Sequence, residues 1–190
     1  MDIILLNKPY RVLSQFRDRD GRQTLAGLIQ RPNYYPAGRL DYDSEGLLLL
    51  TDSGAVQHRV ANPQNKMEKT YWVQVEGEPS QPSIQQLRRG IELRDGKTKP
   101  AGIARMDTPT LWARRPAVTP HRASRSHWLE ISLKEGRNRQ VRRMLAAVGL
   151  PVLRLVRIGI GPWRLDNLQP GESRLETIHL PRTGKKTERR

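Results

Sequence analysis

The sequence contains no cysteine, and this absence excludes two kinds of site. Disulfide bonds and thiolate metal sites both need cysteine side chains. The four histidines are scattered along the chain, and none of them belongs to an H-E-x-x-H pattern. No apolar run approaches the ~20 residues that a membrane-spanning helix needs. The sequence therefore predicts no structural zinc site and no membrane contact.

Acidic residues are few relative to basic ones. The chain has 34 Lys and Arg against 19 Asp and Glu, which gives a net charge of +15. A positive field of this size favours an anionic partner, and nucleic acid is the first candidate. The apolar run Ile3–Leu6 is too short for a secretion signal, and no basic segment precedes it. We therefore expect a cytoplasmic, monomeric protein that acts on nucleic acid.

The clearest helix is predicted over residues 138–148. Its apolar residues repeat at +3, +4 and +7 and form one stripe, namely Val141, Met144, Leu145 and Val148. Arg139 and Arg143 project from the opposite face, whereas Arg142 lies at the flank of the stripe. From this flank, Arg142 is expected to reach into a cleft beside the core.

Alternating strands and helices are predicted along the rest of the chain. Strands are expected at residues 1–6, 69–75, 128–133 and 152–158. Helices are expected at residues 24–29, 53–60 and 80–89, and Ser80 is the expected N-cap of the last one. A hairpin around Asp95-Gly96 is predicted over residues 91–106.

Three carboxylates stand at alternate positions before a glycine in the middle of the chain, namely Asp41, Asp43 and Glu45. The spacing resembles a calcium loop whose last ligand would be Asp52. That position normally needs the longer Glu, and prolines at 32 and 36 interrupt the helix that should precede the loop. A solvated acidic turn is the plain alternative. In so basic a chain, however, a carboxylate here indicates chemistry, with nearby arginines keeping it ionised.

Four motifs occur in order, namely Asn7-Lys8-Pro9, Gly38-Arg39-Leu40-Asp41 with Ser44–Thr51, Lys69-Thr70-Tyr71, and Glu135–Met144. Together they resemble the family of bacterial ribosomal RNA pseudouridine synthases, from residue 1 to about 176. The resemblance implies an α/β fold of the α+β type, with a mixed, mostly antiparallel sheet in two lobes and the active cleft between them. It also implies a catalytic domain over residues 1–180 without the S4 module of some relatives. The basic tail, residues 181–190, is expected to be disordered.

The resemblance also implies a reaction and the residues that perform it. The family breaks the C1′–N1 bond of a uridine and rejoins the base through C5, with neither metal nor cofactor. Asp41 would be the catalytic carboxylate, acting by covalent addition or by proton abstraction, and the sequence leaves both open. Tyr71 would stack on the uracil and Arg142 would pair with Asp41. Arg39 would fill the gap left by the flipped base.

Further substrate contacts are expected around these residues. Ile158 and Leu165 would form an apolar floor under the base or simply pack in the core. Lys8 would hold a phosphate or simply be exposed, and Arg139 would lie on the basic helix face. Residues 112–128 form a basic segment without an acid, whose arginines are Arg114, Arg115, Arg122 and Arg125. Prolines at 116 and 120 are expected to keep it extended, which suits irregular RNA, although a surface insertion is the plain alternative.

Two positions depart from the family pattern. Arg11 stands where many relatives have Gly, and Tyr42 follows the catalytic Asp where a basic or polar residue is usual. Two other classes of protein compete with the family prediction. A non-catalytic RNA-binding protein explains the charge but not the conjunction of Asp41, Tyr71 and Arg142. A nuclease that uses the three carboxylates would require a divalent ion.

Overall fold

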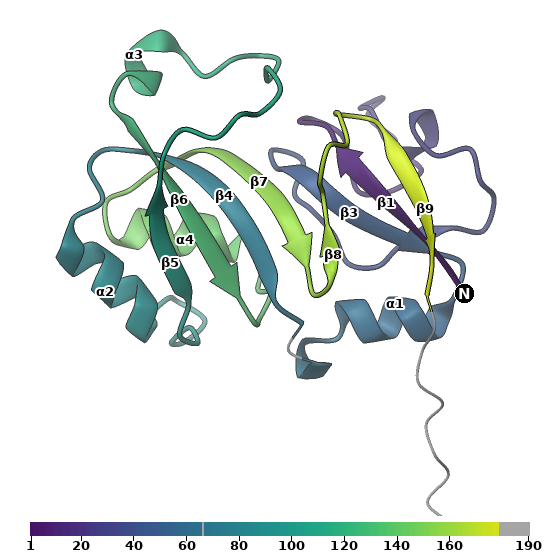
Figure 1. The fold of residues 1–190 in the computed structure, drawn as a ribbon, viewed down its shortest axis with the longest axis horizontal. Helices are drawn as coiled ribbons and strands as arrows, with labels where there is room; N and C mark the ends of the chain where they lie inside the picture. The colour runs from purple at the N-terminus through teal and green to yellow at the C-terminus, as the bar shows by residue number, and fades with distance from the viewer. Residues whose placement is uncertain (66, 179–190) are drawn as a thin grey trace, which may run out of the picture.

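The computed structural model describes residues 1–65 and 67–178, and within them one nine-stranded sheet runs through the molecule (Figure 1). The strands are β1 (Asp2–Lys8), β2 (Tyr35–Pro36), β3 (Glu45–Thr51), β4 (Lys69–Glu76), β5 (Gly102–Met106), β6 (Ser126–Leu133), β7 (Val152–Ile160), β8 (Trp163–Arg164) and β9 (Ser173–Thr177). The helices are α1 (Gly54–Ala61), α2 (Gln81–Arg89), α3 (Pro120–Ala123) and α4 (Gln140–Ala147), with 3-10 turns η1 (Leu25–Gly27) and η2 (Pro63–Asn65).

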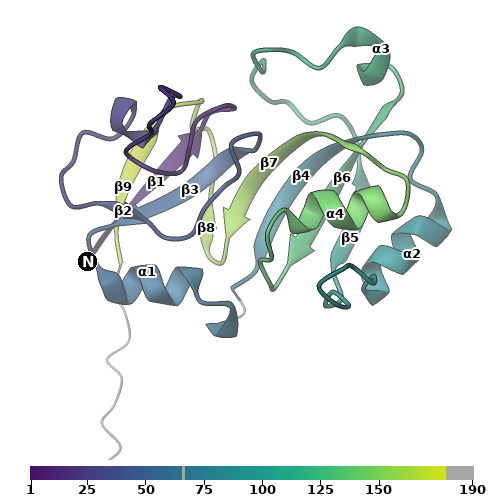
Figure 2. The ribbon, with the colours of Figure 1, turned by 180° about the vertical axis from the view of Figure 1, so that it is seen from behind.

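The strand order is β5-β6-β4-β7-β3-β1-β9, with β2 beside β3 and β8 beside β7. Strands β3 and β7 are parallel and meet only briefly, where Glu45 pairs with Val156 and Gly46 with Arg157. The other strand pairs of the described sheet are antiparallel. The short parallel contact joins a lobe built on β1, β3 and β9 to a lobe built on β4 to β7 (Figure 2). The predicted mixed, mostly antiparallel sheet is confirmed.

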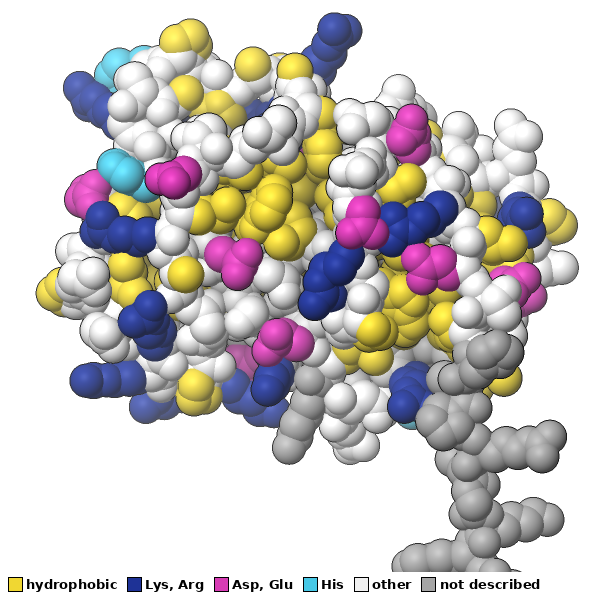
Figure 3. Space-filling model, viewed as in Figure 1, with side chains coloured by type: hydrophobic (Ala, Val, Ile, Leu, Met, Phe, Trp, Pro, Cys, Tyr) yellow, Lys and Arg dark blue, Asp and Glu magenta, His cyan; other side chains and the backbone are white. Residues whose placement is uncertain are grey.

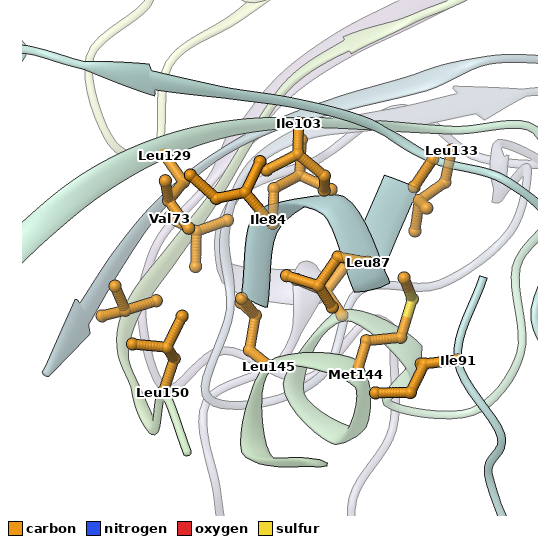
Figure 4. Close-up of a cluster of buried hydrophobic side chains, with 14 of the residues drawn as sticks. Val73, Ile84, Leu87, Ile91, Ile103, Leu129, Leu133, Met144, Leu145 and Leu150 are labelled. Atoms are coloured by element: carbon orange, nitrogen blue, oxygen red, sulfur yellow. The ribbon is translucent and has the colours of Figure 1, made fainter. Parts of the chain in front are cut away.

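Each lobe buries its own apolar side chains. In the β4–β7 lobe, α2 and α4 cover one face of the sheet (Figure 4) and contribute Ile84, Leu87, Met144 and Leu145. In the other lobe, all residues of β3 are buried. Leu47 and Leu49 pack on α1, whereas Leu48 and Leu50 pack under the segment before β3. Because side chains alternate between the faces of a strand, this two-sided burial explains the continuous apolar run of β3.

Local capping signals set the helix ends. The Ser53 hydroxyl accepts a hydrogen bond from Val56 N at 3.4 Å and caps α1. Ser80 caps α2 in the same way, and α2 ends at Gly90, whose φ is 87°. α4 buries the apolar stripe as predicted. No helix among the described residues has the length and apolarity needed to span a bilayer.

The hairpin predicted over residues 91–106 is wrong. The turn itself forms, since Gly96 N donates to Leu93 O at 2.9 Å, but β5 begins at residue 102 and pairs with β6. The Arg137 guanidinium donates to the carbonyls of residues 95, 96 and 97. These carbonyls are therefore bound by a side chain from the segment before α4 and not by the backbone of a facing strand.

Candidate active site

A pocket of about 580 Å³ receives residues from both lobes. The segment before β3 contributes Arg39 and Asp41, while β4 contributes Tyr71. Arg139 and Arg142 reach it from the start of α4, which lies in front of the β4–β7 sheet in Figure 2. The five residues that the sequence predicted to act on the base and its surroundings therefore share one pocket.

The backbone around Asp41 is fixed on both sides. Ser14 Oγ donates to Leu40 O at 2.8 Å and accepts from Leu40 N at 3.1 Å. Ser44 N donates to Asp41 O at 3.1 Å, which closes a turn. The Asp41 side chain stays 32% exposed, so its carboxylate faces the pocket from a rigid support.

Arg11 keeps the backbone form that glycine favours. Its φ is 59°, in the left-handed region, although the side chain is arginine. Arg11 N donates to Tyr42 O at 2.8 Å and so ties the N-terminal motif to the turn that contains Asp41. The first departure from the family pattern therefore leaves this connection in place. Tyr42 itself is exposed.

Lys8 was predicted to hold an RNA phosphate, but its side chain is turned into the protein. Its side chain is fully buried, and Nζ donates to Pro9 O and Val12 O at 2.8 Å each. Burial lowers the pKa of Lys8 from 10.5 to about 7, although the charge of Glu45 acts in the opposite direction. Lys8 therefore closes the turn that follows β1.

Lys8 predicts a pH dependence of stability. Its pKa is about 7 in the folded protein and near 10.5 in the unfolded chain, so the unfolded chain binds more protons between these values. The free energy of unfolding should therefore rise with pH across this interval, by at most ~1.4 kcal/mol per unit from this group. Below pH 7 Lys8 should contribute no slope. Urea denaturation of wild type and Lys8→Met from pH 6 to 10 measures the difference, and equal slopes for both proteins would contradict the assignment.

Asp43 is the main partner of the arginines at the start of α4. Arg139 donates to both Asp43 carboxylate oxygens at 2.8 Å and lies 3.5 Å from Asp41 Oδ2. Arg142 Nη2 donates to Asp43 O at 2.6 Å, and its Nε lies 3.4 Å from Asp43 Oδ2. Arg142 was predicted to pair with Asp41, but its ion pair is with Asp43. Asp41 is thus the carboxylate left open to a substrate.

The charges around Asp43 keep its carboxylate ionised. Burial raises the pKa of Asp43, but the Arg139 hydrogen bond and the charges of Arg142 and Arg139 outweigh it, and the pKa lies below its usual value. Burial lowers the pKa of Arg142, and the negative charge of Asp43 acts in the opposite direction. The result is an ionised cluster that holds α4 against the turn that contains Asp41.

Both carboxylate oxygens of Glu45 accept hydrogen bonds from other side chains. Glu45 is 1% exposed, and Arg154 donates to it through Nε and Nη2 at 2.9 Å each. The Trp112 indole donates to Glu45 Oε1 at 2.8 Å. A carboxylate held in this way has no free oxygen to offer a metal ion. This removes one ligand from the calcium-loop and nuclease hypotheses, and the described residues contain no group of three His, Asp or Glu suited to a metal.

Two site features were missed from the sequence. Arg157 lines the pocket beside Tyr71 and is 5% exposed, yet in the sequence it was only one residue of the strand expected at residues 152–158. The one sign of its role in the sequence was a charged side chain within a mostly apolar predicted strand. The second feature is Glu135, buried before α4, which accepts hydrogen bonds from Lys99 N at 3.0 Å and from the Gln140 amide. Glu135 thus supports the turn that carries Arg139 into the pocket.

Ile158 and Leu165 do not form the floor of the pocket. Ile158 lies next to Arg157 on β7, so its side chain points to the other face of the sheet. Both residues line a separate hollow with Trp72 and Leu111. The apolar wall of the catalytic pocket comes instead from Leu133, Leu155 and Ile160.

The basic segment before β6 is partly bound to the protein itself. Arg114 stacks on Tyr10, with Cζ 4.5 Å from the ring centroid, and donates to Leu153 O at 2.8 Å. Arg122 forms an ion pair with Glu76 at 2.7 Å. The segment is not extended throughout, because residues 120–123 form α3. Arg115 and Arg125 remain exposed. The face in Figure 3 has acidic side chains among the basic ones.

Comparison with known proteins identifies the class. The family described as RNA pseudouridylate synthase matches residues 2–147. A solved structure described as a crystal structure of pseudouridylate synthase superposes with a TM-score of 0.77 at 32% identity, covering 93% of this chain and 71% of that one. The chain therefore belongs to the RNA pseudouridylate synthase family, and the predicted isomerase class is confirmed.

Two curated relatives are similar over almost their full length. Ribosomal large subunit pseudouridine synthase E of Xanthomonas campestris pv. campestris is 54% identical over 183 residues, which cover 95% of this chain and 98% of that protein. The protein of the same name from Xanthomonas axonopodis pv. citri is 57% identical over 171 residues, covering 88% and 90%. The predicted resemblance to the ribosomal RNA pseudouridine synthases is confirmed.

Proposed function

We propose that this enzyme converts one uridine of large-subunit 23S ribosomal RNA to pseudouridine, with Asp41 as its catalytic carboxylate. The observation that supports this most is that Asp41 is open to a pocket shared with Tyr71, while the neighbouring Asp43 is bound by arginines. The substrate follows from the similarity to relatives named for the large ribosomal subunit. An RNA of this kind places the reaction in the cytoplasm, and we propose that the enzyme acts there as a monomer.

The reaction needs a base that has left the RNA helix. The N1–C1′ bond breaks, the C5–C1′ bond forms, and the proton lost from C5 is balanced by one gained at N1. Asp41 faces the sugar, and Tyr71 offers a flat ring to the uracil. Arg39 is exposed at the mouth of the pocket, where a planar cation can stack in the gap left by the base.

The basic residues around the pocket position the RNA. Arg139 lies at the pocket with its guanidinium on Asp43, and its side chain is 43% exposed. Arg115 and Arg125 are the exposed arginines of the segment before β6, and they extend the positive surface for phosphate. Arg114 and Arg122 contribute indirectly, because their contacts with Tyr10 and Glu76 hold this segment against the rest of the protein.

Mapping of ribosomal RNA tests the proposal directly. A strain that lacks this protein should lose one pseudouridine from its large-subunit RNA, and the wild-type gene should restore it. Small-subunit RNA serves as the internal control. Unchanged maps of both RNAs would contradict the proposed substrate.

Arg142 and Arg143 form a matched pair on one helix. The Arg142 side chain is 14% exposed and binds the turn that contains Asp41, whereas Arg143 binds Asp95 at 2.7 and 3.0 Å. Arg142→Leu should slow single turnover by about a hundredfold, because small displacements of a catalytic group cost about this much. Arg143→Leu should stay within a few-fold of wild type. Rates that do not differ between the two variants would refute the role given to Arg142.

A further inference from the structure

Arg157 stands where three strands meet. In β7 it pairs with Gly46 of β3 on one side and with Tyr71 of β4 on the other. A Cβ on Gly46 would lie 2.3 Å from Arg157 O, so the two backbones approach as closely as a glycine permits. The backbone of Arg157 is therefore fixed relative to both lobes.

The guanidinium of Arg157 is buried at high cost. Its side chain is surrounded by protein, and Nε donates to Leu47 O at 2.8 Å. Nη1 lies 3.5 Å from Arg39 O, and Nη2 is buried without a hydrogen-bond partner among residues 1–65 and 67–178. A buried cation with an unused donor is expensive, and in a pocket wall it indicates a functional demand.

Tyr71 is the functional neighbour of this cation. Cross-strand partners project from the same face of a sheet, and Tyr71 and Arg157 both line the catalytic pocket. A bulge between Thr70 and Tyr71 shifts the register at this point. Burial lowers the pKa of Arg157, and the neighbouring Tyr71 phenol acts in the opposite direction.

We propose that Arg157 is a positioning residue for Tyr71, and that its unused donor binds the phenolic oxygen when RNA is bound, so that the ring faces the flipped base. A guanidinium has donors only, so the phenolic oxygen accepts and its hydroxyl hydrogen stays free toward the pocket. Lysine offers one point charge in place of a planar fork and cannot hold Leu47 O and the phenol in the same geometry. The inference rests on the proposed role of Tyr71.

A double-mutant cycle tests the inference. Single-turnover rates and RNA affinities are measured on unmodified large-subunit ribosomal RNA for Arg157→Lys, Tyr71→Phe and the double variant. Arg157→Lys should slow the reaction about tenfold to a hundredfold while RNA affinity changes less than about twofold. In the Tyr71→Phe background, Arg157→Lys should have no further effect on the rate, because it acts through the phenol. Arg164→Lys, an exposed change outside the pocket, is the control.

Each outcome decides between the two proposals. A loss of the same factor with and without the Tyr71 hydroxyl would show a general structural role and overturn the inference. An unimpaired Arg157→Lys beside an impaired Tyr71→Phe would overturn the inference alone. Wild-type rates for Tyr71→Phe would overturn the role of Tyr71 in the proposed function. Thermal melting checks that each variant folds, and Arg157→Gln replaces the lysine variant in the cycle if that one does not.

Discussion

Asp41→Asn is expected to abolish isomerisation while RNA binding persists. Asparagine keeps the size of the side chain but removes its charge and its nucleophilic oxygen. Loss of an essential group of this kind commonly slows a reaction at least ~10⁴-fold, which corresponds to about 5.5 kcal/mol of barrier. Single-turnover rates and filter binding on unmodified ribosomal RNA measure the two properties separately.

Asp43→Asn is the matched control for this experiment. Arg142 also binds the backbone carbonyl of residue 43, which the substitution leaves in place. The variant loses the charge that Arg139 binds with two hydrogen bonds, so turnover should fall but stay measurable. Appreciable turnover by Asp41→Asn would refute the catalytic assignment. Equal, complete losses at both positions would instead favour a site in which the two carboxylates share one ion.

Breaking the buried pair of Glu45 and Arg154 is expected to have the largest effect on stability. The Glu45 side chain is 1% exposed and that of Arg154 10%. Glu45→Gln leaves the guanidinium buried without a counter-charge, and Arg154→Met does the same to the carboxylate. Each change should lower the free energy of unfolding by about 3–5 kcal/mol. Chemical denaturation of the purified proteins measures this loss.

The double variant Glu45→Gln/Arg154→Met separates the pair from its parts. Because no unpaired charge remains, it should lose less than the sum of the single losses. The exposed pair of Glu78 and Arg105 is the control, and Glu78→Gln should cost under about 1 kcal/mol. Single losses at Glu45 and Arg154 no larger than this control would show that water reaches the pair.

Local patterns were sufficient to predict α1, α2, α4, four of the strands and the turn that contains Asp41, whereas the predicted hairpin over residues 91–106 is wrong. The apolar stripe of α4 and the apolar run of β3 are visible in a few consecutive residues, and so is the motif that contains Asp41. Each of these features depends on helix periodicity or on burial of a contiguous segment, so no knowledge of the topology was needed.

Partner choice over long distances could not be predicted in this way. Glu45 and Arg154 are separated by 109 positions, and Trp112 and Glu45 by 67. They meet only because β3 runs parallel to β7 over two residue pairs, which no local pattern encodes. Lys8 shows the same limit, since a lysine in a polar motif is usually exposed and here turns inward to two carbonyls.

The pairing of β1 with β9 determines the order in which the lobes can be completed. Ile3 pairs with Glu176, so the outer edge of β1 stays open until the C-terminal strand has been synthesised. The β4–β7 lobe lies between these strands in the sequence and has all its own strands before then. It can therefore fold on the ribosome before β9 has paired with the free edge of β1. An unpaired edge of this kind invites aggregation, so the last strand also protects the first.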